Sequence, residues 1–126
     1  MLLLILLSAC SSQDPLDSEK FISDSEYAYE LLTNAYDQGR QLSLEEQDKL
    51  LRYDIYYSSD ETDYDLTTNQ RILSSAILIM NLDLKGLSRT TSTIGESLDH
   101  DESFNTYAEE AKAAIETLKK ELEENQ

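Results

Sequence analysis

The apolar positions of the chain recur with the spacing of an α-helix from about residue 18 onwards. Steps of three, four and seven residues place side chains on one face of a helix. Over 18–38 two such series run one residue apart, and Gly39 follows them, which predicts a helix that ends at a left-handed glycine. The two series are Ile22, Tyr29, Leu32 and Tyr36, and Phe21, Ala28, Leu31 and Ala35.

A second helix is predicted from Ser43 to about Tyr57. Ser43 and Glu46 have the spacing of a capping box, in which the two side chains bind each other's backbone N–H groups. The apolar spacing predicts that this helix buries Leu44, Leu51 and Ile55, with Leu50 and Tyr53 as further members of the buried face.

The third predicted helix, over 66–85, is the most hydrophobic segment of the body. Its longest uninterrupted apolar run covers only 76–80, which predicts a core helix and not a membrane span. Gly86 is the predicted stop of this helix. The predicted core seam consists of Leu66, Leu73, Ile77, Met80, Leu84 and Leu87, widened by Ile72, Ala76 and Ile79.

A Ser/Thr-rich connection over 87–98 separates this helix from a last one over 100–124. The last helix has apolar residues at steps of four and three, and its other face is charged. No alternating strand pattern competes with the helical spacing. The sequence therefore predicts an all-α domain over 19–126, a small four-helix bundle. The apolar positions of the last helix are Phe104, Ala108, Ala111, Ile115, Leu118 and Leu122.

The N-terminal segment differs from the body because residues 1–7 are uniformly apolar and residues 8–12 are small. Seven helical residues rise only about 10 Å, which is too short to span a bilayer but matches the hydrophobic region of a signal peptide. The single cysteine of the chain, Cys10, follows Leu7, Ser8 and Ala9 directly. The alternative interpretation is a cytosolic protein with an apolar N-terminus and a buried free thiol.

The tetrapeptide Leu7-Ser8-Ala9-Cys10 resembles the lipobox of bacterial lipoproteins. The resemblance implies that residues 1–9 are a cleaved signal peptide and that the Cys10 sulfur carries a diacylglyceryl group as a thioether, with further acylation of its amino group. Residues 10–18 are then the lipidated N-terminus and a polar tether, and the protein is held at the extracytoplasmic face of the cell membrane. Signal peptides begin with a basic residue, whereas the first one here is Lys20, so we expect the natural start to lie upstream.

The composition excludes several classes of function. The formal net charge of −16 excludes a basic nucleic-acid binder, because phosphate contacts need a Lys/Arg surface. One His and one Cys cannot supply a Cys/His metal cage. Phosphate-binding and hydrolase motifs are absent from the sequence, so we expect neither an enzyme, nor a small-molecule substrate, nor a cofactor.

Two polar segments leave alternatives open. The acidic stretch 58–65 has alternating carboxylates but no glycine, so it is read as a solvated loop in preference to a calcium site. His100, the only histidine, lies among acids at the start of the last helix, where an exposed histidine is preferred to a metal ligand or a general base. The carboxylates of the stretch are Asp60, Glu61, Asp63 and Asp65.

Tyrosines gather around the end of the second helix and the acidic stretch. Because Tyr56 and Tyr57 are adjacent, a helix cannot bury both rings, so at least one is expected at the surface. Tyrosine is enriched at protein interfaces, which makes Tyr56, Tyr57 and Tyr64 the candidate partner-binding residues. The alternative is that these rings pack across the bundle with only their hydroxyl groups in water.

The overall plan of lipobox, short tether and small polar domain resembles the exclusion or immunity lipoproteins of conjugative elements and phages in Gram-positive cells. That resemblance implies an interaction domain that meets a protein at the cell surface and blocks redundant transfer of a mobile element. The acidic charge also holds such a body away from an anionic membrane. The alternative function is a cation-binding or solute-capturing envelope lipoprotein that uses the acidic stretch.

Overall fold

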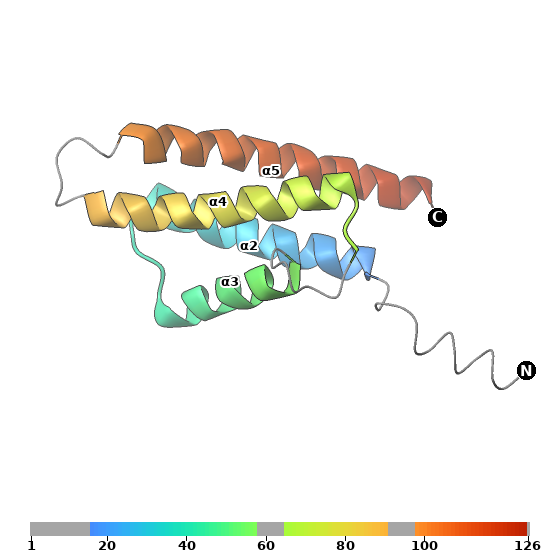
Figure 1. Ribbon diagram of the computed structural model, residues 1–126, viewed down its shortest axis with the longest axis horizontal. Helices are drawn as coiled ribbons and strands as arrows, with labels where there is room; N and C mark the ends of the chain where they lie inside the picture. The colour runs from blue at the N-terminus through green and yellow to red at the C-terminus, as the bar shows by residue number, and fades with distance from the viewer. Residues whose placement is uncertain (1–15, 58–64, 91–97, 126) are drawn as a thin grey trace, which may run out of the picture.

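The computed structural model describes residues 16–57, 65–90 and 98–125. These residues form four helices, α2 (Ser18–Gln38), α3 (Leu44–Tyr57), α4 (Thr68–Thr90) and α5 (Leu98–Glu124). Helices α4 and α5 lie side by side, α2 packs against both of them, and the shorter α3 lies at the margin of the bundle against α2 and α4 (Figure 1). The described chain contains no strand, and the prediction of an all-α four-helix bundle is confirmed.

The core lies between α2, α4 and α5. Phe21, Leu32 and Phe104 are completely or almost completely buried there. Of the predicted seam, Leu73, Ile77, Met80 and Leu84 of α4 are buried, as are Ala76 and Leu66, which precedes the helix. The side chain of Leu87 is outside the described part of the chain. Ile72 and Ile79 were predicted to widen this seam, but Ile72 is exposed and Ile79 is only partly buried, because both lie beyond the edge that faces α2 and α5. None of the helices in the described ranges is both long enough and apolar enough to cross a membrane.

Both ends of α2 follow the prediction. The Asp17 carboxylate accepts a hydrogen bond from the Lys20 backbone N–H at 3.1 Å, which caps the first turn. At the other end Gly39 has a φ of +60°, a conformation that costs glycine little. The Gly39 N–H donates to the Tyr36 carbonyl and the Arg40 N–H donates to the Ala35 carbonyl, so these two carbonyls of the last turn are satisfied.

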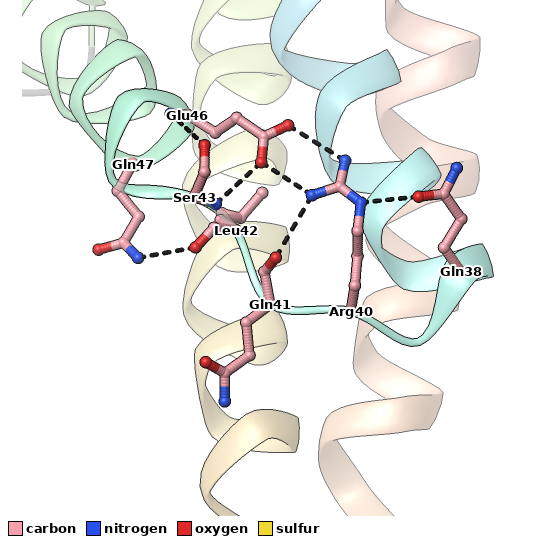
Figure 2. A network of polar contacts seen from close by, with 7 residues as sticks. All are labelled: Gln38, Arg40, Gln41, Leu42, Ser43, Glu46 and Gln47. Atoms are coloured by element: carbon pink, nitrogen blue, oxygen red, sulfur yellow. Dashed lines mark hydrogen bonds and ion pairs between the residues drawn. The ribbon is translucent and has the colours of Figure 1, made fainter.

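The turn between α2 and α3 is fixed by the predicted capping box and by an arginine. The Ser43 N–H donates to Glu46 Oε1 at 2.9 Å, and the Glu46 N–H donates to Ser43 Oγ at 3.1 Å. The Arg40 guanidinium binds both oxygens of the same Glu46 carboxylate, at 2.8 and 3.1 Å, and also Gln38 Oε1 at 2.7 Å (Figure 2). These bonds tie the first turn of α3 to the end of α2.

The Glu46 contacts predict a pH dependence of stability. Hydrogen bonds from Arg40, and then from the Ser43 backbone, lower the pKa of Glu46 to about 2. A carboxylate with a lowered pKa stabilises the fold above its unfolded pKa of about 4.3, and this contribution is lost as the pH falls towards 2. We therefore expect Glu46→Gln to lower the free energy of unfolding at pH 7, and the difference from the wild type to shrink between about pH 4.5 and 2.

Urea unfolding of both proteins at several pH values measures this difference. Glu45→Gln is the matched control, since Glu45 lies one position earlier and its contact with Lys49 is a longer, more exposed ion pair of 3.6 Å. A Glu46→Gln difference that stays constant across this pH range would contradict the prediction.

Helix α4 does not stop at Gly86 as predicted but continues to Thr90, and α5 begins at Leu98. The reason for a glycine at this position is close approach between helices. A Cβ atom on Gly86 would lie 2.8 Å from two atoms of the His100 ring of α5, so only glycine leaves room for that ring. The helix continues because one glycine costs it only about 1 kcal/mol relative to alanine.

Helix α3 buries a different face from the predicted one. Leu44, Leu51 and Ile55 are exposed, with 84%, 55% and 57% of their surface accessible. The buried positions are Leu50, Tyr53 and Tyr57, which lie on nearly the opposite side of the helix. The prediction was therefore wrong for Leu44, Leu51 and Ile55, and it is confirmed for Leu50 and Tyr53.

Candidate interaction surface

Two tyrosines attach α3 to α2. The Tyr53 hydroxyl and Ser25 Oγ form a buried hydrogen bond of 2.7 Å, and the Tyr57 hydroxyl donates to Asp24 Oδ2 at 2.7 Å. The Tyr57 ring also meets the Phe21 ring edge to face, with 4.9 Å between the centroids. Burial raises the pKa of Tyr53, so its hydroxyl stays protonated. These contacts explain why the tyrosine face of α3, and not the leucine face, turns inwards.

An apolar groove of about 210 Å³ opens at the surface between α2 and α3. Aromatic side chains dominate its walls, since four of the eight tyrosines of the chain line it. We call it the α2–α3 groove. Its lining residues are Lys20, Asp24, Tyr27, Ala28, Leu31, Lys49, Leu50, Arg52, Tyr53, Tyr56 and Tyr57.

Cations gather at this groove although the chain is strongly acidic. Lys20, Lys49 and Arg52 are three of only ten Lys and Arg residues, and Asp24 is the single acid of the lining. The lining therefore carries a formal charge of 3 − 1 = +2, against −16 for the whole chain. Each of these cations also forms an ion pair with a carboxylate: Lys20 with Asp24, Lys49 with Glu45 and Arg52 with Asp48. The groove is therefore lined by ion-paired side chains and is not a free basic patch.

The lysines of the groove lie against its exposed tyrosines. Lys49 Nζ donates to the Tyr27 hydroxyl at 3.0 Å and lies 5.3 Å from the centroid of that ring. This hydrogen bond raises the pKa of Lys49, so its charge is retained at neutral pH. Lys20 Nζ lies 5.9 Å from the centroid of the Tyr56 ring, within the range of a cation–π contact.

The predicted partner-binding tyrosines have different positions. Tyr56 is 55% exposed, as expected for one member of the adjacent pair. Tyr57 is only 4% exposed and holds α3 against α2, so it does not offer the free ring that the prediction assumed. Tyr64 and Cys10 lie outside the described residues.

The sequence reasoning missed Tyr27, which is 49% exposed on the α2 side of the groove. Its position outside both apolar series of α2 was the available signal, because a large aromatic on a polar face is a candidate contact residue. It also missed Lys49 and Arg52, which no spacing rule connects with tyrosines on another helix.

His100, predicted to be exposed, is partly buried, with 38% of its side chain accessible. Its Nδ1 lies 3.2 Å from Asp83 Oδ1 on α4, and its ring covers Gly86. Across the described ranges, no three His, Cys, Asp or Glu side chains gather closely enough to hold a metal ion. Of the acidic stretch, Asp60, Glu61 and Asp63 lie outside those ranges, and Asp65 is exposed.

The chain matches no protein-family model, no curated protein and no solved structure at a significant level. Tyrosine rings provide contact area with few rotatable bonds, and the lysine and arginine side chains pair with carboxylates. This combination suits binding of a protein segment.

Proposed function

We propose that the protein is a lipoprotein anchored through Cys10, and that its helical domain is an interaction module at the outer face of the cell membrane. The α2–α3 groove is its contact surface for a protein partner. Within this class, the proposed role is exclusion or immunity, in which the domain binds an incoming transfer machine and blocks redundant transfer of a mobile element.

The observation that carries the proposal is the gathering of tyrosines and cations in one groove. Protein interfaces are enriched in tyrosine and arginine, and their binding energy is concentrated in aromatic residues that fill pockets. Tyr27 and Tyr56 are both about half exposed on either side of this groove. A binding role requires only an exposed surface of this kind, located at the membrane face that the partner reaches.

The anchor defines where this surface works. Since Ser18 is the first residue of α2, the proposed tether consists of residues 11–17. Seven residues span at most about 25 Å when extended, so the domain stays within a short distance of the lipid headgroups. Two acyl chains hold a protein on a membrane far more firmly than one. A partner that reaches the cell surface therefore meets the domain at high local concentration.

Two substitutions test the anchor and the groove separately. Cys10→Ser should abolish labelling by a radioactive fatty acid and remove the protein from the membrane fraction, because a hydroxyl cannot form the thioether. Tyr56→Ser should leave labelling and location unchanged but remove protection against transfer, measured as the transfer frequency into cells that express the protein.

The control for the groove is Leu82→Ser on α4, since Leu82 is as exposed as Tyr56 but does not line the groove. It should keep both the membrane location and the protection. An unchanged membrane fraction for Cys10→Ser would refute the anchor. Full protection by a correctly folded double variant, Tyr27→Ser with Tyr56→Ser, would refute the groove as the contact surface.

A further inference from the structure

The exposed side of α3 carries an apolar stripe that is distinct from the α2–α3 groove. Leu44, Leu51 and Ile55 follow each other at steps of seven and four, so they lie along one line of the helix. Leu44 is the most exposed large hydrophobic residue described, at 84%. We call these three residues the α3 outer stripe, and we propose that it pairs with the outer stripe of a second copy of this chain, with the two α3 helices antiparallel.

The spacing of the stripe is compatible with a two-fold axis. In an antiparallel pair of identical helices, the two-fold axis can pass halfway along the stripe, between positions 49 and 50. Leu44 of one copy then lies opposite Ile55 of the other, and the two Leu51 side chains meet close to the axis. The apolar residues thus cover each other without any change in the fold of either copy.

The charges beside the stripe are complementary in the same arrangement. Asp48 and Arg52 lie one turn apart along one edge of the stripe and form an ion pair of 3.0 Å within the chain. The two-fold axis of this antiparallel pair is perpendicular to both helix axes and to the line that joins the helices. It therefore leaves this edge on the same side of the pair in both copies. It therefore brings Arg52 of each copy beside Asp48 of the other, so four alternating charges replace two isolated pairs. The edge is therefore complementary in charge to itself, which favours a second copy.

The rest of the structure holds the stripe outwards. Arg40 and Glu46 fix the first turn of α3 (Figure 2), and the Tyr53–Ser25 hydrogen bond fixes its inner face. Helix α3 lies at the margin of the bundle, so a second helix can approach it from outside (Figure 1). A 14-residue helix is about 21 Å long and offers an interface below the size typical of stable complexes. The pairing is therefore weak in dilute solution and is favoured where copies are concentrated on a surface.

The association has a characteristic salt dependence. Two bodies of charge −16 repel each other, while the contact itself is mainly apolar. Added salt screens the repulsion, because the screening length falls from about 10 Å at 0.1 M to about 3 Å at 1 M. Sedimentation equilibrium of the full chain should therefore give a dissociation constant that falls as salt is added, the reverse of an association held by opposite net charges.

The test compares two leucines of equal exposure. Leu51→Glu places a charge in the centre of the proposed contact and should raise the dissociation constant at least about tenfold. Leu82→Glu introduces the same change on α4, at a residue that is also 55% exposed, and should leave the constant unchanged. Circular dichroism checks that both variants keep the helical fold.

A charge exchange tests the register. Asp48→Arg should weaken the association, because two arginines from each copy then face each other, and the double variant Asp48→Arg, Arg52→Asp should restore it. The proposal is overturned if the full chain is monomeric at all concentrations and salt levels. It is also overturned if Leu51→Glu leaves the association unchanged, which is the result expected for association through the apolar N-terminal segment. Tyr27→Ser should leave self-association intact, so failure of the groove proposal and failure of this one are distinguishable.

Discussion

Replacing Leu73 with alanine should lower the free energy of unfolding by about 2–5 kcal/mol. Leu73 is 0% exposed and lies in the middle of the seam by which α4 enters the core. Removing its side chain loses the transfer free energy of the buried methyl groups and leaves a cavity that rigid neighbouring helices cannot close. Since small domains are stable by only about 5–15 kcal/mol, this single change removes a large fraction of the total.

Urea denaturation followed by circular dichroism measures the effect. Leu82→Ala is the matched control on the same helix, because Leu82 is 55% exposed and its truncation should change stability by less than about 0.5 kcal/mol. A loss well below 1 kcal/mol for Leu73→Ala would mean that the seam of α4 is not the core of the domain.

The second large effect concerns the hydrogen bond between Ser25 and Tyr53. Both residues are buried, and their hydroxyl groups lie 2.7 Å apart between α2 and α3. Tyr53→Phe leaves the Ser25 hydroxyl without this partner, and Ser25→Ala does the same to the Tyr53 hydroxyl. Each should cost about 1–3 kcal/mol, because a buried polar group that loses its partner retains its desolvation penalty.

The double variant Ser25→Ala, Tyr53→Phe distinguishes this explanation from a simple loss of packing. It removes both polar groups together, so its loss should be smaller than the sum of the two single losses. The difference is obtained from denaturation curves of the four proteins. Strict additivity would show that the two hydroxyl groups do not depend on each other.

Local signals predicted much of the fold. Residues within one or two turns of each other determine three features that were predicted. These are the limits of α2, the left-handed Gly39 and the capping box of Ser43 with Glu46. A second box at the start of α4 follows the same pattern and was overlooked: the Thr67 N–H donates to Gln70 Oε1 at 2.8 Å, and the Gln70 N–H to Thr67 Oγ1 at 3.3 Å.

The errors concern contacts between segments far apart in the sequence. Gly86 has the residue type of a helix stop, but its role is set by the His100 ring on another helix. The buried face of α3 is set by Ser25 and Asp24 of α2, which accept or share hydrogen bonds with Tyr53 and Tyr57. Apolar periodicity treats leucine as a stronger core residue than tyrosine. It could therefore not predict that hydrogen-bond partners for two tyrosine hydroxyl groups decide which face of α3 is buried.

The candidate surface was predictable only in part. The adjacent Tyr56 and Tyr57 showed that one ring had to face outwards, because neighbouring helical residues point in different directions. The packing of α3 across α2 decides which of the two rings is exposed. The same packing places Tyr27, Lys49 and Arg52 beside that ring. The Cys10 motif, in contrast, is a local signal that needs no tertiary structure, and it stays a prediction.

The division of α3 into an inner and an outer side has a consequence for how such a protein diverges. Tyr53 and Tyr57 keep the domain folded, whereas Leu44, Leu51 and Ile55 contribute little to its packing. Mutations at the outer positions are therefore nearly neutral for the stability of the fold, and only contacts with other molecules constrain them. Selection for a new contact can therefore change this side of the helix without destabilising the fold. The residues that recognise a partner can change faster than the residues of the buried face.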